Sequence, residues 1–137
     1  MGPRAVKIMK SPALAVDVVI KTRDGVVLVK RRNEPYKGMW ALPGGFVEYG
    51  EKVEFAAIRE AEEETGVKVK IQKLLGVYSD PERDPRGHVI SVCFLAKRVG
   101  GSLKAASDAK EVMIFKKIPW QKLAFDHAKI LKDAGFK

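Results

Sequence analysis

The sequence predicts an α+β domain in which two helices flank a mostly mixed β-sheet. The segments 13–22 and 26–31 are rich in β-branched residues and flank the turn RDG, a pattern typical of a β-hairpin. Residues 51–65 show instead the periodic spacing of apolar residues that is typical of a helix. Further runs that alternate or are continuously apolar predict strands over 67–78, 88–99 and 111–118.

The segments between these elements also carry structural signals. After the hairpin, the polar segment RNEPYKG leads to the short run MWALP and to the pair Gly44-Gly45. The helix should end at Gly66, because glycine adopts the left-handed conformation that closes many helices. Residues 79–87 predict a polar loop, and GGS at 100–102 predicts a turn. A last amphipathic helix is expected over 120–136, with one side formed by Leu123, Ala124, His127, Ala128 and Leu131.

Length and charge limit the class of protein and of partner. With 137 residues the chain can bury a core of its own, so we expect one domain over 1–137. The net charge of +9 favours an anionic partner, but no helix-turn-helix, zinc-finger or basic-tail pattern accompanies it. We therefore expect a small phosphorylated ligand and no nucleic acid. The apolar run at 13–20 contains Asp17 and is too short to span a bilayer, so no membrane partner is expected.

The N-terminal sequence and the single cysteine bear on the compartment. The segment MGPRAVKIMKSP lacks the apolar stretch of a secretory signal. Cys93 excludes an internal disulfide framework and lies in a strand-like run, where we expect an inert buried thiol. These observations predict a cytoplasmic protein. The scarcity of Asn and Gln beside many Lys and Glu is a bias seen in thermophile proteins.

Four glutamates crowd the last turns of the first predicted helix: Glu60, Glu62, Glu63 and Glu64. Acids are unfavourable there, because a helix C-terminus carries partial negative charge and like charges one turn apart repel. The helix face that carries Glu60 and Glu64 begins with small apolar residues, whereas Glu62 lies on the opposite side. An exposed acidic face balanced by lysines is the alternative interpretation. It fits poorly, because only Arg59 and Lys68 are spaced to pair with these acids.

A divalent cation would account for the acidic cluster. Two carboxylates about 4 Å apart repel by roughly 4 kcal/mol at an effective dielectric constant of about 20. A cation bound between them removes that repulsion. Oxygen ligands without His or Cys favour Mg²⁺, or Mn²⁺ in its place.

The spacing of these residues resembles the Nudix box, G-x5-E-x7-R-E-U-x-E-E-x-G-U, in which U is apolar. Every fixed position is present: Gly45, Glu51, Arg59, Glu60, Glu63, Glu64 and Gly66. Ala61 and Val67 occupy the apolar positions, and Ala61 is smaller than the usual residue. The resemblance extends over nearly the whole chain. It implies a single Nudix hydrolase domain over 1–137, with the family's α/β/α sandwich of a mixed sheet flanked by helices.

This resemblance implies metal-dependent hydrolysis of the pyrophosphate bond in a nucleoside diphosphate linked to another group. The implied metal ligands are Glu60, Glu63, Glu64 and the carbonyl oxygen of Gly44. Arg59 is expected to orient these carboxylates, and Glu51 to support the metal site or to orient Arg59.

The general base stays open at this point. It is either a box glutamate, Glu63 or Glu64, or an acid outside the box. Glu82 ranks first among the outside acids, because its loop can close over the metal. The other outside acids are Asp80, Asp84, Asp108 and Glu111.

The resemblance also narrows the substrate. Family members that hydrolyse ADP-ribose carry a proline beyond the box, in the position of Pro81. We therefore expect ADP-ribose to be converted to AMP and ribose 5-phosphate. The candidate substrate contacts are Arg31, Arg32, Tyr36, Gly45, Phe46, Pro81, Arg83 and Arg86, the arginines for phosphate or ribose and the aromatic residues for the base.

Two alternatives are kept. One is a Nudix hydrolase of nucleoside triphosphates or dinucleotide polyphosphates. The other is an ADP-ribose-sensing domain without enzymatic activity, which the intact box disfavours. A homodimer is compatible with the sequence, which does not set the oligomeric state.

Overall fold

The computed structural model describes residues 10–104 and 111–137 and contains one mixed β-sheet. Its strands are β1 (Ala13–Thr22), β2 (Gly25–Lys30), β3 (Trp40–Ala41), β4 (Gly44–Phe46), β5 (Val67–Tyr78), β6 (Val89–Gly101) and β7 (Val112–Phe115). They follow the order β3-β2-β1-β6-β5, with β4 paired to β1 and β7 paired to β2. The β1–β6 pair is parallel and the other strand pairs are antiparallel. The predicted hairpin and mixed sheet are therefore confirmed.

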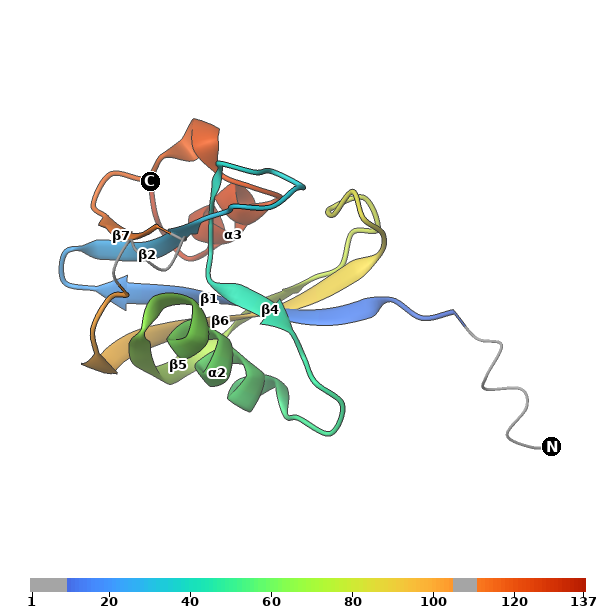
Figure 1. Cartoon of the computed structure of the whole chain (residues 1–137), viewed down its shortest axis with the longest axis horizontal. Helices are drawn as coiled ribbons and strands as arrows, with labels where there is room; N and C mark the ends of the chain where they lie inside the picture. The colour runs from blue at the N-terminus through green and yellow to red at the C-terminus, as the bar shows by residue number, and fades with distance from the viewer. Residues whose placement is uncertain (1–9, 105–110) are drawn as a thin grey trace.

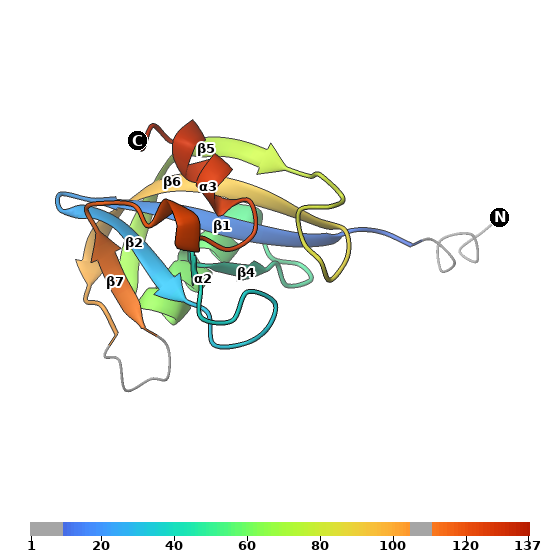
Figure 2. The same ribbon diagram turned by 90° about the horizontal axis from the view of Figure 1, so that it is seen from above.

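Helices cover both faces of this sheet (Figures 1 and 2). Helix α2 (Val53–Thr65) packs on one face, and helix α3 (His127–Asp133) with the short 3₁₀ helix η2 (Trp120–Lys122) packs on the other. Alternation along β1 divides the core between the two layers. Val18 and Ile20 join the cluster that contains the alanines of α2, while Val19 joins the cluster that contains Ile130 and Leu131 of α3. This is the expected α/β/α sandwich.

The end of α2 agrees with the prediction. Gly66 has the left-handed backbone angles φ 82° and ψ −4°, and its N–H donates to the carbonyl oxygen of Glu62 at 2.8 Å. The buried residues of α2 are small (Ala56, Ala57, Ala61 and Thr65), so the helix lies close to the sheet. Strand β5 begins directly afterwards and pairs with β6 through Gly100 and Gly101, which the sequence predicts to be turn residues.

The single helix predicted over 120–136 is wrong. The structure has η2 and α3 there, separated by an extended Leu123 and by Phe125 at φ 53°. Leu123 forms a parallel bridge with Trp40, and the N–H of Ala124 donates to the Trp40 carbonyl oxygen at 2.8 Å. These tertiary hydrogen bonds replace the helical ones, because the apolar residues of this segment are buried by contacts with β3.

Two findings bear on the expectations about the thiol and the membrane. Cys93 is fully buried, as expected for an inert thiol. Among the described residues, no helix combines the length and apolar character needed to cross a membrane.

Candidate active site

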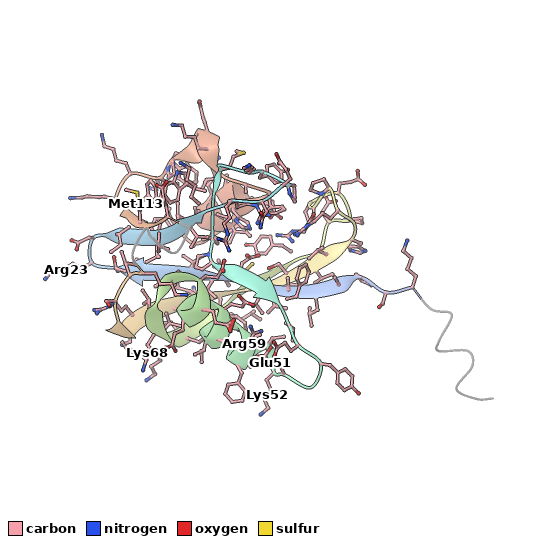
Figure 3. All side chains as sticks on the ribbon, in the orientation of Figure 1. Arg23, Glu51, Lys52, Arg59, Lys68 and Met113 are labelled. Carbon is pink, nitrogen blue, oxygen red and sulfur yellow. The ribbon has the colours of Figure 1, made fainter. Side chains whose placement is uncertain are left out.

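Arg59 binds three of the box glutamates at the surface of α2. Its Nε and Nη2 atoms donate to the two carboxylate oxygens of Glu51 at 2.7 and 2.9 Å. Its Nη1 atom donates to Glu60 at 2.9 Å and to Glu63 at 3.0 Å, and Nη2 also reaches the carbonyl oxygen of Phe46 at 3.2 Å. Figure 3 shows Arg59 and Glu51 side by side where the chain enters α2. One guanidinium therefore ties the start of the helix to its acidic end.

The carboxylates held by Arg59 differ in their pKa. The hydrogen bond from Arg59, with one from the backbone of Glu48, lowers the pKa of Glu51 to about 2. Burial raises the pKa of Glu60, and the neighbouring charges of Glu64 and Glu63 raise it further, against the opposing effect of Arg59. Added positive charge near Glu60 would therefore favour its ionised form.

The two glycines of β4 each face a carboxylate. A Cβ atom on Gly45 would lie 2.3 Å from Oε2 of Glu60, on the α2 side of the strand. A Cβ atom on Gly44 would lie 2.5 Å from Oδ1 of Asp17, which belongs to the neighbouring strand β1. Because successive residues of a strand point to opposite faces, β4 separates these two acids. Only glycine permits this close approach of both.

A cavity of about 270 Å³ opens beside β4. It is lined from β1 by Ala15, Val16 and Asp17, from β2 and the following loop by Val29, Lys30, Arg31, Arg32 and Asn33, from β3, β4 and their connection by Ala41, Leu42, Gly44, Gly45 and Phe46, and elsewhere by Glu64, Arg83, Asp84, Arg86, Val89, Phe125 and His127. Burial lowers the pKa of Arg31, and the positive charge of Arg86 lowers it further, whereas Glu64 acts in the opposite direction. An anionic ligand would relieve the repulsion between these two guanidinium groups.

Aromatic rings and guanidinium groups gather at this cavity. The guanidinium of Arg86 lies 5.7 Å from the ring centroids of both Phe46 and Phe125, and that of Arg31 lies 5.0 Å from Phe125. The ring of Tyr36 contacts Phe125 edge-on at 4.7 Å and does not line the cavity. Flat apolar faces beside arginines suit a ligand that combines a base or sugar with phosphate.

Two of the predicted loop residues lie away from this cavity. Glu82 lines a separate depression beside the end of β5, with Asp80, Lys129 and Asp133. Pro81 is exposed and lines neither hollow. The described loop conformation therefore does not bring Glu82 to the box glutamates.

The arginines of that loop differ in their partners. Arg83 forms a bidentate pair with Asp126, at 2.9 and 2.7 Å, and only 5% of its side chain is exposed. Arg86 pairs with Asp84 at 2.8 Å and keeps 46% of its side chain exposed. Of the two, Arg86 is the more accessible to a ligand.

The other acids considered as a base take different positions. Asp84 is almost fully buried against Arg86, and Glu111 forms an exposed ion pair with Lys30 at 3.5 Å. Asp80 is exposed and accepts a hydrogen bond from the backbone of Glu82. Asp108 lies outside the described residues. Among the box glutamates, Glu64 lines the cavity.

Sequence reasoning missed Asp17 and Phe125 as cavity residues, and it placed His127 only on the apolar side of the last predicted helix. Asp17 interrupts an apolar strand, a signal that points to a buried polar site. Phe125 had no such signal, since its position depends on the break between η2 and α3. Burial raises the pKa of Asp17 and lowers that of His127.

The donor set fits a hard divalent cation. Glu60, Glu63 and Glu64 offer carboxylate oxygens alone, and the burial of Glu60 favours a bound positive charge. Over the described ranges 10–104 and 111–137, no three His, Cys, Asp or Glu side chains already converge as a metal site. Arg59 holds Glu60 and Glu63 instead, so these acids would have to share their oxygens between the guanidinium and the ion.

The fold and this cavity, lined by acids and arginines, are chemically suited to a phosphorylated small molecule. The model of the NUDIX domain matches residues 11–134. The chain therefore belongs to the NUDIX domain family and is a Nudix hydrolase.

Similar proteins of known name or structure agree with this assignment. The chain is 57% identical over 122 residues to an ADP-ribose pyrophosphatase of Methanocaldococcus jannaschii, covering 89% of this chain and 72% of that protein. A bifunctional NMN adenylyltransferase/ADP ribose pyrophosphatase of Francisella tularensis, solved with AMP and a manganese ion, matches with a TM-score of 0.75 and 28% identity, over 94% of this chain and 43% of that one. The NUDIX domain of Shewanella oneidensis NrtR, solved with ADP ribose, matches with a TM-score of 0.74 and 29% identity, over 98% and 91% of the two chains.

Proposed function

We propose that this protein hydrolyses the pyrophosphate bond of ADP-ribose to give AMP and ribose 5-phosphate, with Mg²⁺ or Mn²⁺ as cofactor. The observation that carries the proposal is the cavity in which Glu64 and the glycines of β4 lie with Arg31 and Arg86. The 57% identity to an ADP-ribose pyrophosphatase supports the same substrate. The NUDIX domain of NrtR has a similar fold and was solved with ADP ribose, which supports the view that a domain of this fold can hold that ligand.

Glu60, Glu63 and Glu64 would hold the cation, and the carbonyl oxygen of Gly44 would assist. A divalent cation supplies neutralisation of the pyrophosphate charge and a lower pKa for a bound water. Other side chains of the protein would hold these ligands in position. Arg59 orients Glu60 and Glu63 through Nη1, and its fork to Glu51 keeps that guanidinium in place.

The substrate would be oriented by the opposite wall of the cavity. Arg31 and Arg86 bring positive charge to the phosphates, and Phe46 and Phe125 present apolar ring faces to the base or sugar. Glu64 is the box acid on the cavity surface, which makes it the first candidate for the general base in this conformation. Glu82 would require a movement of its loop to act.

A substrate panel tests the proposal. ADP-ribose, nucleoside triphosphates, dinucleotide polyphosphates and sugar nucleotides are compared at saturating Mg²⁺ by kcat/KM. ADP-ribose should rank first, with AMP and ribose 5-phosphate as products. A tenfold preference for a nucleoside triphosphate would replace the proposal with the hydrolase of that class.

The non-enzymatic alternative has one observation in its favour, the binding of ADP ribose by the NUDIX domain of NrtR. A sensor would bind ADP-ribose without turnover. Calorimetry with ADP-ribose beside the activity assay separates the two, because tight binding with no product in the presence of Mg²⁺ would identify a sensor.

A further inference from the structure

Asp17 is a carboxylate in the middle of the apolar strand β1, between the fully buried Val16 and Val18. Only 9% of Asp17 is exposed, and it lines the cavity described above. An acid in such a position is rare unless its oxygens have partners, because a buried charge loses its hydration. The hydrogen bonds of its two oxygens therefore indicate its role.

The two oxygens of Asp17 are not equivalent. Oδ2 accepts a hydrogen bond from the hydroxyl of Ser91 at 2.5 Å. Oδ1 lies 3.6 Å from Nε2 of His127, beyond hydrogen-bond distance. The nearest approach of Arg83 to the carboxylate is 3.9 Å, to Oδ2. Among the described residues, Oδ1 thus has no donor at hydrogen-bond distance.

The two neighbouring donors differ: Arg83 is held by another acid, whereas Nε2 of His127 faces Oδ1 from beyond hydrogen-bond distance. Nδ1 of His127 accepts the N–H of Leu42 at 3.0 Å, so a neutral ring carries its proton on Nε2, while the Arg83 guanidinium is held by both oxygens of Asp126. In the described part of the chain, no side-chain oxygen is both sealed from solvent and without a partner. Oδ1 is therefore open to the cavity.

Gly44 keeps this oxygen open. A side chain at position 44 would begin 2.5 Å from Oδ1 and would cover it. Gly45 does the same for Glu60 on the other side of β4. The cavity is consequently lined by Asp17 and by Glu64 of the box, with the almost fully buried Asp84 as a third acid.

We propose that Asp17 is a specificity-determining residue whose Oδ1 accepts a hydrogen bond from a donor on the group attached to the pyrophosphate, either a ribose hydroxyl or the amino group of adenine. This inference rests on the proposed function. A carboxylate accepts hydrogen bonds and repels phosphate, so it selects a neutral, donor-bearing part of the substrate. A site built for one donor rejects an analogue that lacks it, since the buried acceptor would be left unpaired.

The test is a cycle of variants and substrates. Wild type and Asp17→Asn are assayed with ADP-ribose and with analogues that each lack one donor: the adenine amino group, a hydroxyl of the adenosine ribose, or a hydroxyl of the distal ribose. Wild type should discriminate against one analogue by roughly 10- to 100-fold in kcat/KM. Asp17→Asn removes the charge but keeps one amide oxygen that can accept, so it should lower that ratio severalfold, and the identity of the analogue names the donor.

Two further variants keep the result interpretable. Asp24→Asn makes the same chemical change in the exposed β1–β2 turn and should leave the discrimination ratio unchanged. Asp17→Ala removes the acceptor altogether and should reduce the discrimination ratio to about twofold or less. Because each ratio compares substrates on one variant, a partial loss of folded protein cancels from it.

A binding measurement adds a readout that needs neither metal nor turnover. AMP and ribose 5-phosphate are titrated separately by calorimetry without metal, and Asp17→Asn should weaken one of the two. The inference is overturned if the ratios and both affinities are unchanged, or if Asp17→Asn lowers kcat equally for every substrate. Failure of the wild type to hydrolyse ADP-ribose would instead overturn the proposed function, and it is visible before any variant is made.

Discussion

Gly45 lies directly against the carboxylate of Glu60, so that a Cβ atom at position 45 would be 2.3 Å from Oε2 and 2.4 Å from the carboxylate carbon. Position 45 must therefore be glycine if Glu60 is to keep this place, although the two residues are 15 positions apart in the sequence. Any side chain at position 45 must move Glu60 away from β4.

Gly45→Ala should lower kcat strongly while leaving the fold intact, because the displaced atoms belong to the end of one side chain. The matched control is Gly100→Ala, where the added Cβ would meet only Lys68 side-chain atoms at 3.8 Å. Activity and thermal melting of both variants check this. Equal activity of the two variants would show that the position of Glu60 does not matter for turnover.

Glu60→Gln and Glu64→Gln should each reduce turnover by several orders of magnitude, because each removes a charge proposed to bind the cation. Glu62→Gln is the matched control, since Glu62 is exposed on the opposite side of α2. Mg²⁺ should also raise the melting temperature of the wild type and of Glu62→Gln, but not that of Glu64→Gln. Near wild-type activity of either ligand variant at saturating Mg²⁺ would contradict the site assignment.

The pair of Glu51 and Arg59 predicts a pH-dependent contribution to stability. The pKa of Glu51 is lowered from 4.5 to about 2 in the folded protein, so folding favours its charged form. The contribution is fully present above pH 4.5 and is lost as the pH falls toward about 2. The stability difference between wild type and Glu51→Gln, measured by urea unfolding, should shrink over this range.

A difference that stays constant from pH 5 to the acid limit of the native state would contradict this linkage. Arg59→Lys tests the geometry of the same pair, because lysine keeps the charge but cannot bind two oxygens of Glu51 at once. We expect it to lower kcat by roughly 10- to 100-fold. Arg23→Lys, in the exposed β1–β2 turn, is the control and should behave as wild type.

Arg83 and Asp126 should be coupled in stability, because their bidentate pair anchors the loop over 79–88 to the start of α3. Arg83→Ala should destabilise the protein by roughly 2–3 kcal/mol, less than for a fully enclosed pair since Asp126 is partly exposed. A double-mutant cycle with Asp126→Ala should give a coupling energy of about 1–3 kcal/mol. Additive effects of the two substitutions would rule out the anchoring role.

Arg86 and Glu82 lie in the same loop and should differ in effect. Arg86→Ala should raise KM about tenfold with little change in kcat, because its guanidinium is exposed at the cavity beside Phe46. Glu82→Gln should keep kcat within about twofold, because Glu82 lies at the other depression and its neighbour Arg83 is anchored. Steady-state kinetics measures both variants, and a large loss of kcat in Glu82→Gln would restore Glu82 as the general base.

The sequence alone determined the features that depend on local pattern and spacing. The hairpin of β1 and β2, the helix that ends at Gly66 and the alternating strand β5 all appear where periodicity and turn residues predict them. The Nudix box was readable because its residues lie in one continuous segment, from β4 through a short loop to the end of α2, so their spacing is visible along the chain. The same reasoning predicted that Cys93 is a buried residue, and it is fully buried.

Only the tertiary structure decided which distant residues meet at the cavity. Asp17, Phe125 and His127 come from opposite ends of the chain and are brought together by the pairing of β1 and by the bridge between Leu123 and Trp40. That bridge also broke the predicted C-terminal helix, since long-range hydrogen bonds replaced local ones. Arg83 pairs with an acid 43 residues away in the sequence and Arg86 with one only 2 away, a difference that no pattern of charges in a polar loop could predict.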